Sequence, residues 1–468
     1  MATTQPQTIG DLRASGYTTR TVKDELRDNL IKKIRANEEL FPGVVGYEET
    51  VIPMIENAIL SGQDIVLLGE RGQAKTRIAR SLINLLDAEV PAIAGCEIND
   101  DPFNPICKAC QMRVAEEGDN TPIIWLARDR RYGEKLATPD ITIADLIGEV
   151  DPIKVAEGRY LADELTIHYG MIPRTHRGIF CLNELPDLAE RIQVGLLNIM
   201  EERDVQIRGY KVRLPLDVYV VASANPEDYT NRGRIITPLK DRMGSEIRTH
   251  YPRTIAQEIS IMEAESTTPA MDGIEITYPR FMKEIVAEIT HQARKSSDIS
   301  QRSGVSVRVS ISNYENVASN AVRRALRLKE RQAVPRVSDL SAVVASTAGK
   351  IELDTLGDIR EDKIITKLIN QSVLAVFATY FDASDFDQLV AGFERGMNVH
   401  AADNLPSMEY VNQLARVGGL SRAVDKLEGR GNPALIASTV EFILEGLHLN
   451  RRLNKDTSTG AARYRIKG

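Results

Sequence analysis

Residues 64–76 have the sequence Asp-Ile-Val-Leu-Leu-Gly-Glu-Arg-Gly-Gln-Ala-Lys-Thr, a short apolar run followed at once by a glycine-rich loop. Apolar runs of this length are typical of buried strands in parallel sheets. The residues after the loop have helical periodicity, so the loop joins a strand to a helix N-terminus, where backbone N–H groups bind phosphate oxygens. We therefore predict a phosphate-binding loop formed by Gly69, Glu70, Arg71, Gly72, Gln73, Ala74, Lys75 and Thr76.

Two side chains of this loop have predicted chemical roles. Lys75 places a positive charge on the β- and γ-phosphates of a nucleotide, and the Thr76 hydroxyl is a ligand for Mg²⁺. The loop departs from the G-x-x-x-x-G-K-[ST] pattern at one position, because Ala74 stands where the second glycine usually is. Alanine has the smallest side chain that can replace it.

Further apolar runs alternate with helical stretches along the next 180 residues, which predicts an α/β fold with a parallel sheet covered on both faces. These runs are residues 122–126, 178–182 and 218–222. After about Pro252 the strand-like runs stop, and the remaining chain has mainly helical periodicity. We expect the polar tail from Asn454 to be mobile.

A polar pair follows the apolar run at 178–182. In a nucleotide hydrolase a neighbouring strand ends in acidic side chains, one in the Mg²⁺ shell and one that polarises the attacking water. Glu184 is the predicted base, whereas Asn183 occupies the metal position without a charge. An uncharged residue there predicts weaker Mg²⁺ binding, and a simple helix cap is the alternative interpretation of the pair.

The next strand-like run leads into Asn225, whose amide is placed to orient a water molecule toward the γ-phosphate. Arg242 follows in a Lys-Asp-Arg sequence and is a candidate arginine finger for a neighbouring subunit's nucleotide. Arg308, in the helical part, is a candidate contact to the γ-phosphate. Three other arginines are rivals for the finger role, namely Arg232, Arg234 and Arg248.

Taken together, these motifs resemble the AAA+ family, in particular the branch of the magnesium chelatase ATPase subunit I and the MoxR proteins. Gly69-Glu70-Arg71-Gly72 resembles the chelatase form of the loop, and Gln73-Ala74-Lys75-Thr76 resembles the MoxR form. The resemblance implies an α/β AAA+ P-loop domain with a helical lid and an additional C-terminal helical region. The corresponding boundaries are 1–40 for a helical lead-in, 41–252 for the ATPase core, 253–350 for the lid and 351–468 for the C-terminal region.

The same resemblance implies ATP and Mg²⁺ as cofactors, with Asn225 as sensor 1, Arg242 as the finger and Arg308 as sensor 2. It also implies a homo-oligomeric ring, expected to be a hexamer, and a partner with a von Willebrand A domain. Chelatase members drive metal insertion into a porphyrin held by another subunit, and MoxR members activate client proteins. A nucleotide-gated scaffold with little turnover is a third alternative, suggested by Asn183.

Three of the four cysteines lie within fifteen residues of one another, at Cys96, Cys107 and Cys110. The C-x₂-C spacing is typical of a metal site, and thiolates bind zinc. A closed zinc site needs a fourth ligand, for which Asp100, Asp101 or a distant histidine are candidates. A set of free thiols is the alternative interpretation. Cys181 lies in a predicted core strand and is expected to be a small buried apolar residue.

The composition limits the classes of function. The net charge of −7 gives no support for binding to nucleic acid or to an anionic membrane. No apolar run reaches the roughly 20 residues of a membrane span, and the polar N-terminus lacks a signal-peptide core. We therefore expect a cytoplasmic protein. AAA+ transcription activators are disfavoured, because the C-terminal region lacks a helix-turn-helix pattern.

Overall fold

The computed structural model describes the 468-residue chain in two compact units, Met1–His250 and Tyr251–Gly468. The described residues are all those outside 1–4, 152, 154–155, 157–163, 202–203, 207–212, 227–232, 268–272, 355–359, 396, 398, 403, 417–419, 428, 430, 459–460 and 466–468.

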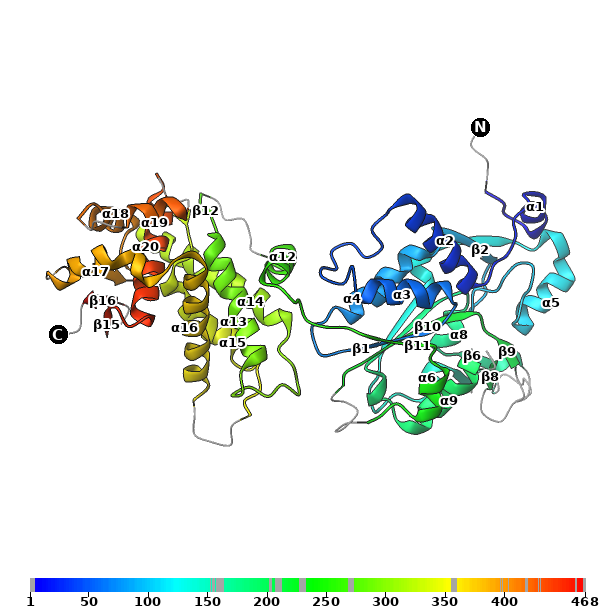
Figure 1. Ribbon diagram of the computed structural model, residues 1–468. Coiled ribbons are helices and arrows are strands. Elements are labelled where there is room, and N and C mark those ends of the chain that lie inside the picture. Colours follow the sequence, from blue (N-terminus) through cyan, green and yellow to red (C-terminus); the bar gives the residue numbers. More distant parts are fainter. Residues whose placement is uncertain are drawn as a thin grey trace. The chain divides into compact units, whose positions relative to one another are not determined.

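The first unit is built on a five-stranded parallel sheet with the strand order β11-β1-β10-β7-β4. Figure 1 labels β1, β10 and β11 of this sheet. The sheet strands are β1 (Ile65–Leu68), β4 (Tyr132–Leu136), β7 (Gly178–Asn183), β10 (Val218–Ala224) and β11 (Ser245–Arg248). Three two-stranded antiparallel pairs accompany it: β2 (Glu89–Ile93) with β3 (Ile123–Ala127), β5 (Gly148–Val150) with β6 (Ile167–Tyr169), and β8 (Asp204–Gln206) with β9 (Arg213–Pro215).

Helices cover both faces of this sheet. The α-helices of the unit are α1 (Ile9–Ala14), α2 (Val22–Ala36), α3 (Val51–Leu60), α4 (Lys75–Ser81), α5 (Lys108–Glu117), α6 (Ile143–Leu146), α8 (Met171–Arg174), α9 (Glu190–Glu201) and α11 (Thr237–Arg242). The short 3₁₀ helices are η1 (Leu82–Leu85), η2 (Gly118–Asn120), η3 (Arg128–Arg131), η4 (Glu164–Thr166) and η5 (Leu185–Asp187).

Alternation along the sheet strands divides their side chains between two cores. Ile65 and Leu67 of β1 pack in the core with α2, α3 and α4, whereas Val66 and Leu68 pack in the core with α6, α8 and α9. Figure 1 shows α2 and α3 on one face of the sheet and α6 and α9 on the other. A buried ion pair fixes α2 to the start of β4, with Arg131 Nη2 2.6 Å from Glu25 Oε2. The sheet is therefore packed against helices on both faces.

One strand prediction needs correction, and two strands of the central sheet were not predicted. The apolar run at 122–126 lies mostly in β3, which pairs antiparallel with β2 and does not join the central sheet. The edge strands of that sheet are instead β4 and β11, whose sequences Tyr-Gly-Glu-Lys-Leu and Ser-Glu-Ile-Arg contain few apolar residues. Edge strands are partly exposed, so hydrophobic patterning does not reveal them.

The second unit is mainly helical. Its helices are α12 (Ile255–Glu265), α13 (Arg280–Lys295), α14 (Val307–Leu328), η6 (Val337–Ala342), α15 (Val343–Thr347), α16 (Glu361–Tyr380), η7 (Ala383–Phe386), α17 (Asp387–Glu394), α18 (Ser407–Arg416), α19 (Ser421–Lys426) and α20 (Pro433–Leu449). Its strands are β12 (Glu275–Ile276) paired with β13 (Gln332–Ala333), and β14 (Val399–Ala402), β15 (Asn454–Ser458) and β16 (Ala461–Arg465) in a sheet of order β14-β16-β15.

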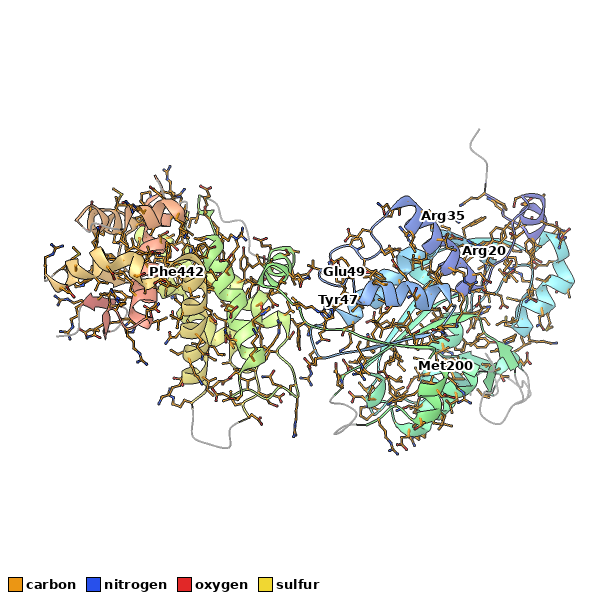
Figure 2. All side chains as sticks on the ribbon, viewed as in Figure 1. Arg20, Arg35, Tyr47, Glu49, Met200 and Phe442 are labelled. Carbon is orange, nitrogen blue, oxygen red and sulfur yellow. The ribbon has the colours of Figure 1, made fainter. Side chains whose placement is uncertain are left out.

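One hydrophobic core extends through this unit, across residues 253–350 and 351–468 alike. Phe442 of α20, labelled in Figure 2, lies in this core, and Phe281 of α13 stacks on it with ring centroids 4.6 Å apart. The expectation of a mobile tail after Asn454 is wrong for β15 and β16, since Tyr464 is buried and its hydroxyl donates to Glu445. Alternation in so short and polar a hairpin is too weak a signal to find from sequence.

Within the described residues, no single helix has both the length and the apolar character needed to cross a membrane. The pair formed by α16 and the segment Ala383–Glu394, bent by 84°, meets these criteria by length and composition alone.

Candidate active site

The glycine-rich loop follows β1 and leads into α4, as the sequence predicts. Gly72 and Ala74 both have positive φ, 77° and 56°, so the backbone turns sharply in this loop. Turns of this kind present successive N–H groups that suit a phosphate. A Cβ atom at Gly69 would lie 1.9 Å from Thr249 Oγ1, which explains why glycine is needed there. Ala74 has a left-handed backbone conformation, which glycine adopts without strain. In alanine the same conformation costs free energy, so the loop is locally strained at Ala74.

Contacts with neighbouring segments hold this loop in place. The side-chain oxygen of Gln73 accepts from Thr249 Oγ1 at 2.7 Å and from the backbone N–H of Glu70 at 3.1 Å. The Tyr47 hydroxyl lies 2.9 Å from the Gln73 carbonyl oxygen and 2.7 Å from that of His250. Burial raises the pKa of Tyr47 to about 12, so its hydroxyl keeps its proton at neutral pH.

Three side chains from three strand ends form a continuous hydrogen-bonded chain. Lys75, which is 7% exposed, donates through Nζ to the side-chain oxygen of Asn225 and to the carbonyl oxygens of Gly69 and Glu70. Asn225 in turn donates through Nδ2 to Glu184 Oε2 at 2.8 Å. The sheet thus brings together the predicted lysine, sensor and base, although they are spread over 150 residues of sequence.

Asn183 has a carboxylate beside it that the sequence interpretation missed. Its Nδ2 donates to Glu134 Oε1 at 2.8 Å, and its Oδ1 accepts from Ser223 Oγ at 3.2 Å. The amide orientation follows from chemistry, because an ionised carboxylate only accepts hydrogen bonds. A hydrogen bond from Arg80 on α4 is the main reason that the pKa of Glu134 lies below its ordinary value.

The candidate arginines lie in different surroundings. Arg242, at the end of α11, is half-buried and its Nη1 donates to the Pro238 carbonyl oxygen at 2.9 Å. Arg234 is exposed, 3.6 Å from Glu190, and Arg232 lies outside the described residues. Arg308 is exposed near the start of α14 in the second unit, and its sensor role stays a prediction.

A cleft of about 490 Å³ opens beside the loop, a volume suited to a nucleotide-sized ligand. Arg248, a rival for the finger role, lines this cleft in its own chain and pairs with Glu246 at 3.6 Å. The cleft is lined by Leu68, Gly69, Glu70, Gln73, Pro226, Lys240, Glu246, Arg248 and Thr249.

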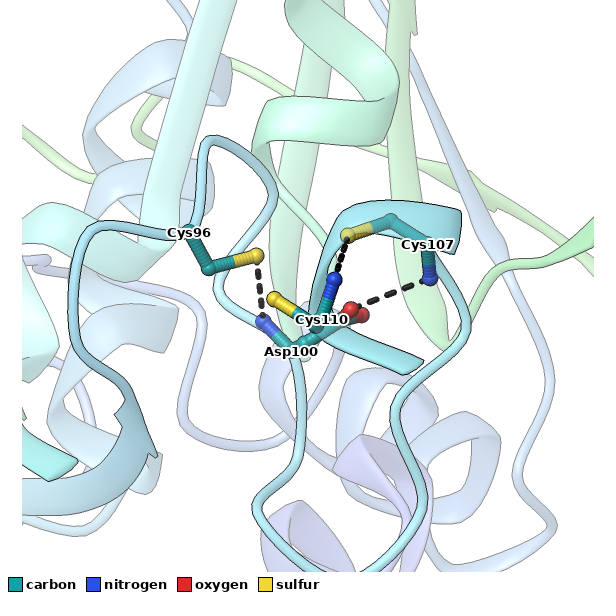
Figure 3. A group of neighbouring side chains, drawn as sticks. All are labelled: Cys96, Asp100, Cys107 and Cys110. Atoms are coloured by element: carbon teal, nitrogen blue, oxygen red, sulfur yellow. Dashed lines mark hydrogen bonds between the residues drawn. The ribbon is translucent and has the colours of Figure 1, made fainter. Parts of the chain in front are cut away.

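The three clustered cysteines meet in the segment between β2 and β3. Cys96, Cys107, Cys110 and Asp100 place one ligand atom each within 4.8 Å of all the others (Figure 3). Hydrogen bonds from the thiols of Cys107 and Cys110 are the largest causes that lower the pKa of Cys96. Cys181 is fully buried in β7, as predicted, and Asp101 pairs with Arg177 instead of joining the cluster.

Comparison with known proteins gives a consistent assignment. A family model described as the Sigma-54 interaction domain matches residues 157–243, which include Glu184 and Asn225. Magnesium-chelatase subunit ChlI-1 of Arabidopsis thaliana is 25% identical over 233 residues, covering 48% of this chain and 50% of that protein. The ChlI subunit of Chlorella vulgaris is 25% identical over 264 residues, covering 55% and 70%. These matches are to AAA+ ATPases, and over about half of its length the chain is similar to magnesium-chelatase subunit I.

The chain spans about half the length of the plant relatives that it matches. Among solved structures, the complex between subunits BchI and BchD of magnesium chelatase matches at 17% identity and a TM-score of 0.36, covering 69% of this chain and 98% of that one. NtrX from Brucella abortus matches at 16% identity and a TM-score of 0.41, covering 74% and 66%.

Several residues at this site could not be predicted from the sequence, for two reasons. Glu134 lies in an edge strand without an apolar pattern, and Thr249 follows another such strand. Tyr47 lies 26 residues before Gln73, and no sequence spacing links the two residues. Recognition of β4 as a sheet strand would have placed Glu134 next to β7, since Glu134 pairs with Cys181.

Proposed function

We propose that this chain is the ATP-hydrolysing motor subunit of a multi-protein machine, and that it couples ATP hydrolysis to metal insertion or remodelling by a partner. The chain of hydrogen bonds from Lys75 through Asn225 to Glu184 supports this proposal most directly. It joins a phosphate-binding cation to a carboxylate base through a neutral amide, at the carboxyl edge of a parallel sheet, where ligands of such folds bind.

Each residue of this edge has a defined task. The backbone N–H groups of residues 69–76 and the Lys75 ammonium would hold the phosphates, and Thr76 would bind Mg²⁺. Bound MgATP supplies a γ-phosphoryl group that can be transferred to water. Glu184 is placed to accept a proton from that water, and Asn225 fixes the Glu184 carboxylate through the 2.8 Å hydrogen bond.

Glu134 supplies the negative charge that Asn183 lacks. Its carboxylate is 2.8 Å from the Asn183 amide and is bound by Arg80, which extends from the same helix that carries Thr76. Because its pKa is lowered, the Glu134 carboxyl group stays ionised at neutral pH. A carboxylate in this position favours a divalent cation, so the neutral Asn183 does not by itself argue for a scaffold without turnover.

The assembly that we propose is a cytoplasmic ring, expected to be a hexamer, with Arg242 acting on the nucleotide of the neighbouring subunit. Its proposed partner carries a von Willebrand A domain. The ChlI relatives favour a chelatase machine. The MoxR-like sequence Gln73-Ala74-Lys75-Thr76 favours a chaperone ATPase for client proteins as the second candidate.

Mixing two inactive variants tests the shared active site. Arg242→Ala is expected to bind ATP but to hydrolyse it 10³–10⁵-fold more slowly, roughly the contribution of an arginine finger. Lys75→Ala loses ATP binding but keeps its own Arg242. Co-assembled mixtures should regain ATPase activity, because some interfaces then combine an intact loop with an intact finger. A mixture that co-assembles and stays inactive would contradict the proposal, and Arg234 would be tested next.

Two experiments separate the candidate machines. Purified chain that binds ATP without turnover, alone or with co-purified proteins from the native host, would favour the scaffold. Porphyrin metallation by the chain with those proteins would support the chelatase function, whereas ATP-dependent activation of a co-purified enzyme would support the MoxR-type function.

A further inference from the structure

The segment between β2 and β3 contains a group of side chains that the nucleotide chemistry does not use. Cys96, Asp100, Cys107 and Cys110 direct three sulfur atoms and one carboxylate toward a common point (Figure 3). Tetrahedral zinc, with Zn–S bonds of about 2.3 Å, requires its sulfur ligands to be about 3.8 Å apart. The four ligand atoms lie within 4.8 Å of one another, so small side-chain rotations reach that geometry. We propose that these four residues bind one structural zinc ion.

The local backbone is arranged as in a metal-binding turn. Cys107 caps the N-terminus of α5, and its Sγ accepts from the N–H of Cys110 at 3.4 Å. The Sγ of Cys96 accepts from the N–H of Asp100 at 3.3 Å. Such N–H donors stabilise thiolates and fix their orientation toward a metal.

Asp100 is the strongest indication that a cation belongs in this group. Its side chain is fully buried, and within the described part of the chain no Lys, Arg or His forms an ion pair with it. It accepts from the N–H groups of Cys107 at 3.0 Å and Ile106 at 3.2 Å, which leaves lone pairs for a metal. A buried carboxylate beside three thiols is costly unless a cation compensates its charge.

The donor set indicates which cation fits. Thiolates select zinc, copper(I) or iron over magnesium and calcium, and the carboxylate oxygen favours zinc over copper(I). A cavity of about 160 Å³ adjoins the three cysteines and provides access for the ion. Four protein ligands complete a tetrahedral shell, which is typical of a structural site and not of a catalytic one.

The ion would hold the segment between β2 and β3 against the rest of the first unit. Cys107 and Cys110 belong to the same core as Leu146 and Tyr169, whereas Cys96 lies on the turn directly after β2. One ion would therefore join the end of β2, the loop around Asp100 and the start of α5. This role is independent of the proposed ATPase function.

Metal analysis tests the proposal. Protein purified without chelator is expected to contain one zinc per chain, and Cys107→Ser or Cys110→Ser should lose it. Cys181→Ser is the matched control, because Cys181 is also buried in the first unit but outside the group, and it should keep the zinc. Metal that survives in both cluster variants, or stoichiometric iron or copper in place of zinc, would overturn the assignment.

Two measurements on the unaltered chain remain decisive if the serine variants fail to fold. Exchange with Co²⁺ should give the intense visible bands of a tetrahedral thiolate site, and a mercurial reagent should release one zinc per chain. Asp100→Asn should weaken zinc binding at least tenfold. Metal-free protein with three freely titrating thiols and no Co²⁺ spectrum would refute the site, and unchanged affinity in Asp100→Asn would remove Asp100 from it.

Discussion

The carboxyl edge of the central sheet and the cysteine group are both polar sites in the first unit, but they are built differently. At the sheet edge, Lys75, Asn225 and Glu184 come from segments up to 150 residues apart, and parallel strands bring them together. The cysteine group comes from residues 96–110, and local turns bring its members together. The first site therefore depends on the fold, whereas we propose that the second supports it. Substitutions should accordingly affect chemistry at one site and stability at the other.

The largest expected effect is on nucleotide binding. Lys75→Ala should weaken ATP binding roughly hundredfold or more, because it removes the charge-assisted contact of a buried ammonium group with the phosphates. Titration with a fluorescent ATP analogue measures this change. Lys32→Ala, on the exposed face of α2, is the control and should bind normally. Normal ATP binding by Lys75→Ala would show that the glycine-rich loop does not bind the nucleotide.

The next effect concerns the metal requirement of the sheet edge. Glu134→Gln should raise the Mg²⁺ concentration for half-maximal ATPase activity about tenfold, which corresponds to about 1.4 kcal/mol. Adding Asn183→Asp to that variant should restore the requirement, because a carboxylate returns to the same place. An unchanged requirement in Glu134→Gln would show that Glu134 is outside the metal shell.

At the cysteine group the expected effect is on stability. Cys107→Ser should lower the Tm by roughly 5 °C or more, since a lost structural metal ion costs several kcal/mol. The affinity of the same variant for ATP, measured below its transition, should stay within about twofold of the unaltered chain. If Cys107→Ser lost much of its ATP affinity but kept its stability, the cysteine group would not be the stabilising site that we propose.

The smallest effect is a pH shift. Arg80 lowers the pKa of Glu134, so the Glu134 carboxylate stays ionised even when the pH falls below the ordinary pKa of a glutamate side chain. Without Arg80 its pKa rises and protonation begins at higher pH. Arg80→Ala should therefore move the acid limb of the ATPase profile to higher pH, while the rate near neutral pH stays unchanged. A shift to lower pH would contradict the coupling.

The sequence predicts those parts of the molecule that carry strong local patterns. The buried strands β1, β7 and β10 are continuous apolar runs, and the order of the motifs after them indicates that Lys75, Glu184 and Asn225 lie on one edge. Several helices, α12 and α16 among them, follow their periodicity closely. The resemblance to the chelatase branch adds the fold family, which the alignments with ChlI support.

Features formed by tertiary contacts were not predictable. The edge strands β4 and β11 are short and polar, so the hydrophobic pattern of the sequence does not reveal them. Neither the position of Glu134 nor the contact of Thr249 with Gln73 could therefore be predicted. The strands β14, β15 and β16 were not predicted either, because they too are short and lack a clear hydrophobic pattern. The cysteine spacing indicated a metal site, but several side chains could have supplied the fourth ligand, and only the fold places Asp100 there.

The central claim is that the polar sheet edge hydrolyses ATP with Glu184 as the base. Single-turnover hydrolysis by Glu184→Gln, compared with the unaltered chain at equal ATP occupancy, tests this claim most directly. The ATP affinity of Glu184→Gln is expected to stay within about twofold of the unaltered chain. Its hydrolysis rate should fall by about 10²–10⁴-fold, the usual contribution of a general base. Hydrolysis by Glu184→Gln at the unaltered rate would contradict it.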